Sequence, residues 1–429
     1  MILSIVIPSF NRKEQLETIL YYLDNQTNVN RHDFEVVVCD FSTDFDVELI
    51  VSPYKSLNIT CLKVREKFNI SKARNIGFES SKGNLITFLD VDIIIMSGFV
   101  SQVISKYEKM DKFIVFYYIY GVFQKKGSQL YHEIKSLTPE KFTNDWCKER
   151  NELRDVREAI FHMSDYERDR VPAPWAFGWS GAFSIDRESF IESGGFDESF
   201  LGWGAEDIDL VYRVLNNNIK YYFDSEISVL HVPHETNKSL NMQTNTLNKE
   251  LMFKKYGTIE MEVHIAASFA YFNEFLLKLN NLHFSSRNPV YSSSFINQLN
   301  NLIEGKRSLC LGLDSFSEIK KLNILEFFSV NERMTNQILD WKQGSVVYQT
   351  LGLQTQFPND CFEIIIIFDS YRFFDEKIRN AIYTESKRIG KKVYQITTKG
   401  FKLYEHNMHY NPLFIENDIM VIENKVNNA

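Results

Sequence analysis

Short apolar runs alternate with amphipathic stretches along the first part of the chain. Apolar runs of strand length occupy residues 3–8, 34–39 and 85–89. In residues 12–25 and 70–80 the apolar residues are spaced so that they form one face of a helix. Strands that alternate with helices predict a mostly parallel, twisted α/β sheet with helices on both faces. In such sheets ligands bind beyond the carboxyl ends of the strands, so we expect the functional residues there.

The same alternation begins again near the carboxyl end. Strand-like runs fall at 307–313, 324–330, 345–350, 362–368 and 392–397, with a helical stretch at 375–389. We therefore expect a first domain over 1–260 and a second, smaller Rossmann-like α/β domain over 296–429. A charge-dense segment at about 125–170 reads as a helical insertion in the first domain, and 261–295 reads as a helical linker whose end is rich in Ser and Asn.

Composition excludes several classes of protein. Lys and Arg number 48 against 56 Asp and Glu, and the net charge of −8 argues against a nucleic-acid binder. The five cysteines form no Cys-x-x-Cys pair, which favours reduced thiols and a cytoplasmic location. No apolar stretch approaches the roughly 20 residues of a membrane span, so no transmembrane segment is expected. Peripheral contact with the inner face of a membrane stays open.

The sharpest local motif is Asp90-Val-Asp92, directly after the apolar run 85–89. Two carboxylates at the end of a buried strand are costly unless a cation neutralises them. Hard oxygen ligands suit Mn²⁺ or Mg²⁺ holding a diphosphate. Solvated aspartates in a strand-end turn would produce the same pattern, so the motif alone leaves both interpretations open.

A second motif, Gly-Trp-Gly-Ala-Glu-Asp, occupies residues 202–207. Its small residues let backbone and ligand approach closely, and Trp203 offers an apolar face to a sugar ring. Glu206 and Asp207 suit a general base near an acceptor hydroxyl. They equally suit the start of a helix, where acidic side chains are favoured by the dipole.

Two histidines, His231 and His234, follow a strand-like run at 227–230. Neutral imidazole is a ligand for ions of the Mn²⁺ class, although a surface loop would explain the pair as well. The Gly- and Trp-rich strip at 174–181 either lines the same site or packs under the sheet.

Together and in this order, Asp-x-Asp, Gly-Trp-Gly-x-Glu-Asp and the following His resemble the GT-A glycosyltransferases of family 2. The later segment is similar to the carboxyl-terminal region of β-1,4-galactosyltransferases and of bacterial chondroitin-polymerase-like enzymes. The resemblance covers roughly residues 2–257, and its implied fold is a GT-A nucleotide-sugar-binding domain. Ala205 departs from the galactosyltransferase pattern, which has Gly there.

The resemblance implies a donor site near the first strands. It assigns the nucleotide to the opening strand and loop, namely Pro8, Phe10, Asn11 and Arg12. It also implies that Asp40 contacts uridine, since Cys39 stands where the family's usual first Asp would be. Phe68 would lie beside the base, and Lys72 or Arg74 could meet the diphosphate.

The resemblance also implies roles near the reacting atoms. Asp92 and His234 would bind the metal, with His231 as a further ligand, and Asp90 would contact the ribose or sugar. Asp207 would be the catalytic base. Glu206 would hold sugar hydroxyls, and Trp203 would pack against the sugars.

The expected activity is an inverting, Mn²⁺- or Mg²⁺-dependent transfer of a hexose or N-acetylhexosamine. The donor would be a UDP-sugar and the acceptor a hydroxyl, in surface polysaccharide or glycoconjugate synthesis. Transfer to a Ser, Thr or Cys side chain of a protein or peptide, and a non-catalytic sugar-nucleotide-binding module, are the alternatives. A nucleotidyltransferase is disfavoured because Pro-Ser-Phe-Asn-Arg replaces its glycine-rich loop after the first strand.

The second domain is harder to interpret. Residues 308–314 and 362–369 faintly resemble a methyltransferase-like nucleotide fold, but the glycine-rich turn is reduced to Gly312, followed by Asp314 and Ser315. A turn without its glycines cannot bring backbone close to a cofactor. We therefore expect a cofactor-free accessory domain for acceptor recognition or for a homodimer contact.

Overall fold

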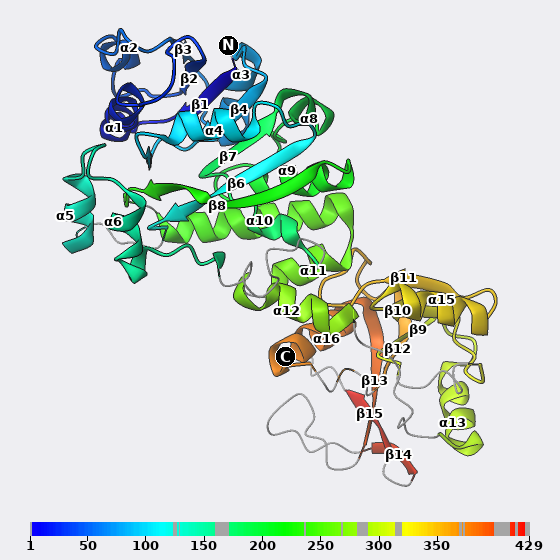
Figure 1. Cartoon of the computed structure of the whole chain (residues 1–429). Coiled ribbons are helices and arrows are strands. Elements are labelled where there is room, and N and C mark those ends of the chain that lie inside the picture. The colour runs from blue at the N-terminus through cyan, green and yellow to red at the C-terminus, as the bar shows by residue number, and fades with distance from the viewer. Residues whose placement is uncertain are drawn as a thin grey trace. The chain divides into compact units, whose positions relative to one another are not determined.

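The computed structural model divides into two compact units, residues 1–251 and residues 252–429 (Figure 1). The residues that it describes are 2–122, 127, 129–158, 171–235, 237–266, 269–280, 291–313, 320–368, 371, 374–398, 412–416 and 419–424. Each unit is built on its own sheet and its own cluster of buried apolar side chains.

The first unit holds an eight-stranded sheet in the order β3-β2-β1-β4-β7-β6-β8-β5. Four strands are parallel neighbours: β3 (Ile59–Lys63), β2 (Phe34–Asp40), β1 (Leu3–Ser9) and β4 (Leu85–Leu89). The others are β7 (Ala182–Asp186), β6 (Phe113–Tyr120), β8 (Lys220–His231) and β5 (Ile93–Ile95). The pairs β4–β7, β7–β6 and β8–β5 are antiparallel, a feature that the sequence pattern did not predict.

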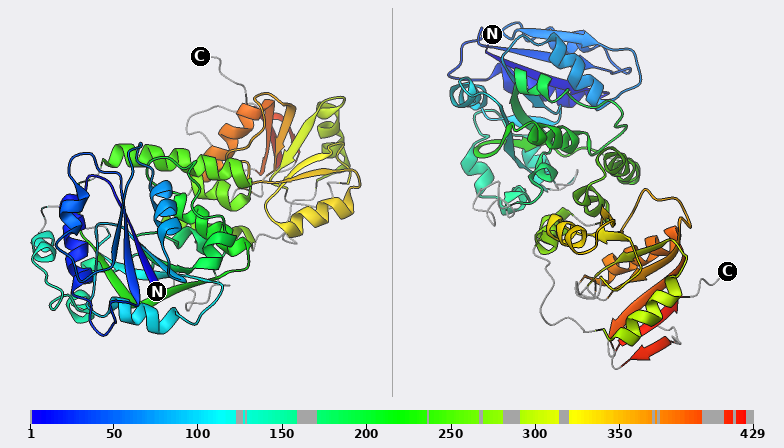
Figure 2. Two further views of the ribbon diagram at one scale, coloured as in Figure 1. Left: turned by 90° about the horizontal axis from the view of Figure 1, so that it is seen from above. Right: turned by 90° about the vertical axis from the view of Figure 1, so that its right-hand side faces the viewer.

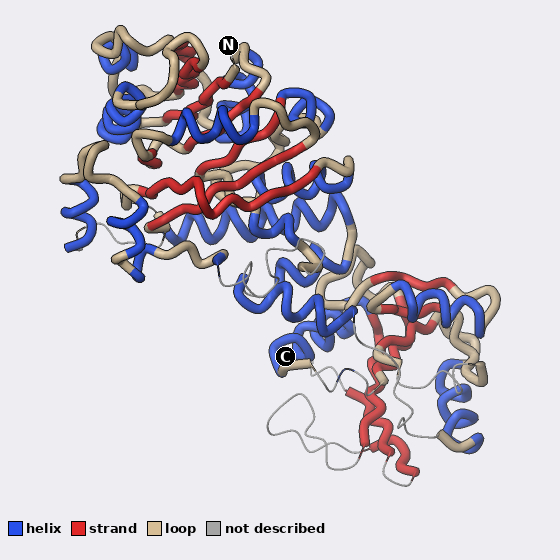
Figure 3. Tube along the Cα trace, in the orientation of Figure 1, coloured by secondary structure: helices blue, strands red, loops and turns tan. Residues whose placement is uncertain are grey.

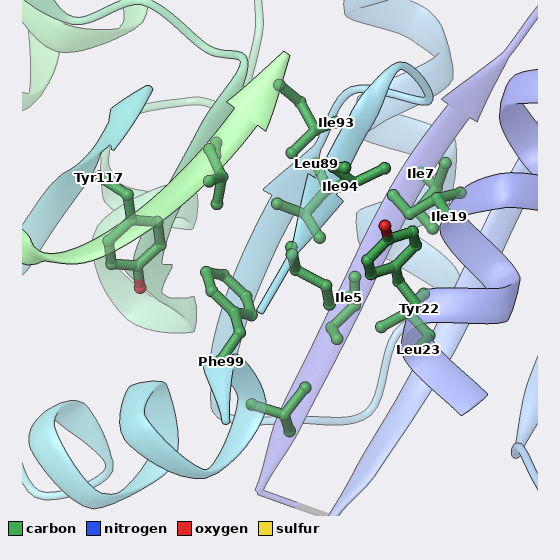
Figure 4. Packing of buried hydrophobic residues seen from close by; sticks show 14 of the residues in the cluster. Ile5, Ile7, Ile19, Tyr22, Leu23, Leu89, Ile93, Ile94, Phe99 and Tyr117 are labelled. Carbon is green, nitrogen blue, oxygen red and sulfur yellow. The ribbon is translucent and has the colours of Figure 1, made fainter. Parts of the chain in front are cut away.

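Helices cover both faces of this sheet (Figures 2 and 3). On one face α1 (Lys13–Asp24) and α4 (Phe99–Tyr107) pack into the main core. Figure 4 shows Ile7 of β1 beside Ile19 of α1, and Ile5 of β1 beside Tyr22 of α1. On the other face, α3 (Ile70–Ser80) sets Gly77 against Val6, because successive strand residues point to opposite sides. The predicted α/β class is confirmed.

Shorter elements complete the first unit. They are α2 (Val47–Val51), α5 (Gln129–Lys135), α6 (Asn144–Lys148), the 3-10 turns Asn151–Leu153 and Pro174–Phe177, α8 (Arg187–Glu192), α9 (Glu206–Asn216) and α10 (Lys238–Tyr256). In the part of the predicted insertion that is described, α5 and α6 are its helices.

The second unit is also α/β, with the strand order β11-β10-β9-β12-β13-β15-β14. Its strands are β9 (Ser308–Leu311), β10 (Glu326–Ser329), β11 (Val346–Gln349), β12 (Phe362–Ile367), β13 (Gly390–Thr398), β14 (Pro412–Glu416) and β15 (Ile419–Asn424). Its helices are α11 (Ile259–Ala266), α12 (Phe269–Asn280), α13 (Ser293–Ile303), α15 (Glu332–Trp341) and α16 (Glu376–Ile389). Neighbouring strands are parallel from β11 through β10, β9 and β12 to β13. The pairs β13–β15 and β15–β14 are antiparallel.

The division between units falls at 251, inside α10, whereas the sequence pattern suggested 260 and a separate linker. The carboxylate of Glu262 explains why α11 belongs with the second unit. It accepts hydrogen bonds from the backbone N–H of Leu351 at 2.9 Å and from the Thr350 hydroxyl at 2.8 Å. Asp314 and Ser315, which follow Gly312, lie outside the described residues.

Among the helices of the described residues, none combines the length and apolar character needed to cross a membrane.

Candidate active site

Strand pairing brings Asp92 to the two histidines. In the antiparallel pair β5–β8, Ile93 lies opposite His231, and the Val232 N–H donates to the Asp92 carbonyl at 2.8 Å. The Asp92 Oδ2 atom is then 2.7 Å from His234 Nε2 and 3.8 Å from His231 Nε2. One ligand atom from each of these three side chains lies within 4.8 Å of the other two, so they form a candidate metal site.

The chemistry of this cluster fits a divalent ion. Burial would raise the pKa of Asp92, but His231, His234 and Arg12 hold that pKa below its ordinary value, so the carboxylate stays ionised. The Nδ1 atom of His231 is buried and has no hydrogen-bond partner among the residues that the structure describes. Two imidazole nitrogens with one carboxylate oxygen suit a first-row ion such as Mn²⁺ better than Mg²⁺, which prefers oxygen ligands.

The buried guanidinium of Arg74, from α3, joins three other segments. It donates to Asp90 at 2.8 Å, to the Ser180 hydroxyl at 2.7 Å and to Glu206 at 3.2 Å. Its guanidinium carbon also lies 4.9 Å from the centre of the Phe196 ring. The arrangement follows from the β4–β7 pairing, in which Leu89 lies opposite Ala182 and the Asp90 N–H donates to the Gly181 carbonyl.

The adjacent carboxylates Glu206 and Asp207 begin α9. Asp207 Oδ2 accepts from the Ser180 N–H at 3.0 Å, and Oδ1 accepts from the Ile208 N–H at 2.8 Å. Burial raises the pKa of Asp207, although the Ser180 N–H and Arg74 oppose this effect. Burial and the neighbouring Asp207 raise the pKa of Glu206 to about 7, and its buried Oε2 atom has no partner within the described part of the chain.

An aromatic pair and a buried carboxylate lie beyond β1 and β2. Phe10, 40% exposed, stacks on Phe68 with ring centres 4.8 Å apart and an angle of 8° between the planes. Asp40 Oδ1 accepts from the Ser42 hydroxyl at 2.5 Å, while its buried Oδ2 meets no hydrogen-bond partner from the described residues. The Asn11 N–H donates to Ser42 Oγ at 2.8 Å. A flat apolar platform beside an unused acceptor atom can hold a heterocyclic base.

Other residues singled out from the sequence lie nearby or apart. Pro8 is buried near the end of β1, opposite Cys39. The Nη2 atom of Arg12 is 3.4 Å from His234 Nδ1, beside the metal cluster rather than the aromatic pair. Lys72 instead forms an ion pair with Glu66, which is exposed. Trp203 is more than half exposed in the loop before α9.

Sequence reasoning did not single out the roles of Ser42, Ser180 and Phe196. Ser180 was only one member of the strip 174–181, and neither serine carries a motif of its own. Their positions depend on loop conformation and on the antiparallel start of β7, which sequence spacing does not reveal. Asp209 is separate from the site, since its carboxylate pairs with Arg213 one turn later in α9.

Comparison with known proteins matches the whole region that carries this geometry. Residues 4–169 match the family described as glycosyl transferase family 2. Residues 160–242, which hold Ser180, Asp207 and both histidines, match the family described as N-terminal domain of galactosyltransferase.

Individual relatives agree with the two families. Validoxylamine A glucosyltransferase of Streptomyces hygroscopicus subsp. jinggangensis (strain 5008) is 28% identical over 270 residues, covering 62% of this chain and 64% of that protein. Its counterpart from subspecies limoneus is covered over 59% of its length, so less than two thirds of either relative is spanned. Chondroitin synthase of Escherichia coli is 30% identical over 223 residues, covering 49% of this chain and 32% of that protein. The crystal structure of S. aureus TarS 1–349 superposes with a TM-score of 0.42 at 17% identity, covering 66% of this chain and 76% of that one.

The fold, the clustered carboxylates and histidines and the family matches together define a glycosyltransferase-type domain with a GT-A fold in the first unit. This domain matches glycosyl transferase family 2 over residues 4–169 and continues into a galactosyltransferase-type segment.

Proposed function

We propose that this protein transfers a hexose or N-acetylhexosamine from a UDP-sugar to an acceptor hydroxyl, with inversion and with the help of Mn²⁺. The observation that carries the proposal is the meeting of Asp92, His231 and His234, since three ligands converge on one point beside the buried network of Arg74. Asp92 lies in the segment that matches glycosyl transferase family 2, and both histidines lie in the segment that matches the galactosyltransferase family. Two relatives are named a glucosyltransferase and a chondroitin synthase, which supports a sugar donor and a saccharide-type product.

Each part of the site has a role in this proposal. A divalent ion held by Asp92, His231 and His234 would neutralise charge on the leaving diphosphate. The Phe10–Phe68 platform receives the base, and Asp40, at the end of β2, is the residue proposed to contact uracil. The contacts of Arg74 favour a role in fixing Asp90 and Glu206, in place of direct contact with the diphosphate.

Asp207 is the proposed base. Its carboxylate takes the proton of the acceptor hydroxyl while that oxygen bonds to the anomeric carbon and the bond from this carbon to the diphosphate oxygen breaks. The raised pKa makes Asp207 a stronger base than a free aspartate. The N–H groups of Ser180 and Ile208 fix the orientation of the carboxylate, and each oxygen keeps a further lone pair for the acceptor.

Calorimetric titration of UDP tests the donor site first. We expect UDP to bind in the presence of Mn²⁺, to lose its affinity with EDTA, and to show the same loss in Asp92→Ala. Asp207→Asn should retain this binding and lose transfer and hydrolysis of UDP-sugars, because it changes the base and not the metal ligands. UDP binding that ignores both EDTA and the Asp92 substitution would contradict the proposed metal-dependent site.

A further inference from the structure

Four large apolar side chains lie more than half exposed around the loop that leads into α9. Their exposed fractions run from 53% to 61%, and they are Leu201, Trp203, Leu240 and Leu247. We call these four residues the apolar band. Exposed apolar clusters are unfavourable in water and mark surfaces that bind a partner or a ligand.

The band is displayed by a fixed scaffold. The Trp203 N–H donates to the Thr244 hydroxyl at 3.1 Å, and that hydroxyl lies 3.0 Å from the Trp203 carbonyl. The Asn248 amide donates to the carbonyls of Leu201 at 3.1 Å and Gly204 at 2.7 Å. The end of the loop is therefore held against α10 at Leu201, Trp203 and Gly204.

Helical spacing places the two leucines of α10 beside this loop. Leu240 and Leu247 lie four residues before and three residues after Thr244, so they share its side of the helix. The loop ends directly before Glu206 and Asp207, where the acceptor hydroxyl reacts in the proposed function. Leu201 and Trp203 of the apolar band thus lie in the chain just before the proposed acceptor site.

The chemistry of the band selects its ligand. The loop carbonyls of Leu201, Trp203 and Gly204 already accept hydrogen bonds from α10. Buried sugar hydroxyls and peptide amides need polar partners, and leucine side chains offer none. Hydrocarbon needs no such partner and gains free energy from contact with leucine and tryptophan.

We propose that the apolar band binds a hydrocarbon chain carried by the acceptor, next to the hydroxyl that receives the sugar. The natural acceptor is then an amphiphile, with its polar, reacting end at Asp207 and its apolar end along α10. This inference rests on the proposed function, because it extends the acceptor side of the same site.

Octyl and methyl glycosides test the proposal, since the members of each pair differ only in the hydrocarbon. Affinities for the glycosides of glucose, galactose and N-acetylglucosamine would be measured calorimetrically with UDP and Mn²⁺ present, below the micelle concentration. At least one octyl glycoside should bind at least about tenfold more tightly than its methyl counterpart, as expected for burying several methylenes. Leu240→Ser combined with Leu247→Ser should reduce this preference several-fold and leave UDP binding unchanged.

A matched control and three contrary outcomes complete the experiment. Leu49→Ser, at a leucine of α2 that is 72% exposed, should leave the octyl preference as it is. Equal affinity for octyl and methyl glycosides, or an unchanged preference in the double variant, would overturn the proposal. Tighter binding of an oligosaccharide that carries no hydrocarbon chain would also overturn the proposal. Failure of UDP to bind the unmodified protein contradicts the proposed function itself, whereas normal UDP binding without octyl preference contradicts only the apolar band.

Discussion

Arg74 sets the charge balance of the site, because Asp90 and Glu206 both form ion pairs with its buried guanidinium. Arg74→Ala would leave these carboxylates without their partner, and we expect a loss of roughly 3–5 kcal/mol in the free energy of unfolding. Arg74→Lys should lose less, since it keeps the charge but cannot reach three acceptors with one planar group. Urea unfolding measures the free energy of unfolding of both variants. Lys72→Ala, which removes an exposed ion pair, is the control and should be nearly neutral.

Metal affinity should depend on pH through His234. The hydrogen bond with Asp92 raises the pKa of His234, so the metal-free ring keeps its proton to a higher pH than an ordinary histidine. Metal binding needs the neutral ring. The Mn²⁺ affinity should therefore rise with pH, by about tenfold per pH unit while His234 is protonated. Calorimetry over a pH series checks this, and a slope that persists in His234→Gln would exclude His234 as its source.

The pair of His234 and Asp92 also makes the stability of the metal-free protein depend on pH. The raised pKa of His234 gives stability that is present below about pH 6.5 and lost as the pH rises through the folded pKa. The lowered pKa of Asp92 gives stability that is present above about pH 3.9 and lost as the pH falls through the folded pKa. The pair therefore stabilises the metal-free protein most between these two values. Melting temperatures measured over a pH series should show this gain in stability in the unmodified protein and should not show it in Asp92→Asn.

Ala205 is held in a backbone conformation that suits glycine. Its φ is +72°, where a Cβ atom costs roughly 1–2 kcal/mol. The glycine of the galactosyltransferase pattern removes that cost, so Ala205→Gly should stabilise the protein by about 1 kcal/mol after the entropy of the unfolded chain is included. Ala73→Gly, in the middle of α3, should destabilise it by about the same amount. If Ala205→Gly and Ala73→Gly changed the free energy of unfolding in urea in the same direction, the conformational explanation would be refuted.

At the scale of elements, contact between α10 and the loop that leads into α9 should determine whether the proposed acceptor site is ordered. Gly204 has φ +101°, and a Cβ there would collide with the side chain of Asn245. Gly204→Ala should therefore destabilise the protein by more than the roughly 1–2 kcal/mol of backbone strain alone. Gly127→Ala is the control, because Gly127 has φ +85° and nothing within 4 Å of its Cβ position. Similar losses for the two variants would mean that the contact with Asn245 contributes nothing.

Sequence pattern predicted β1, α1, β2, α3 and β4 of the first unit, because these strands are continuous apolar runs and these helices have one apolar face. It also predicted the side chains at the ends of strands, including Asp92 and His234, since their motifs are local. It did not predict that Arg74 is enclosed by carboxylates or that Ser180 holds Asp207. Both depend on the antiparallel pairing of β7 with β4, which brings together segments distant in the sequence. A strand's direction leaves no mark in its own apolar pattern.

At the scale of the whole molecule, one cluster of buried apolar side chains lies within residues 3–230 of the first unit, and another lies within residues 291–421 of the second. Each unit can therefore unfold as a cooperative body of its own, and calorimetric heating should resolve two transitions. UDP with Mn²⁺ binds only the first unit in the proposed function. At a hundred times its dissociation constant it should stabilise that unit by about 2.7 kcal/mol.

The two transitions can be assigned with one substitution. In Asp92→Ala the transition of the first unit should no longer move with UDP and Mn²⁺, because the carboxylate that holds the metal is gone. The transition of the second unit should be the same in both proteins, with and without ligand. A ligand-induced shift of both transitions would mean that the second unit binds nucleotide or unfolds together with the first. Nucleotide binding by the second unit would also contradict the expectation of a cofactor-free accessory domain.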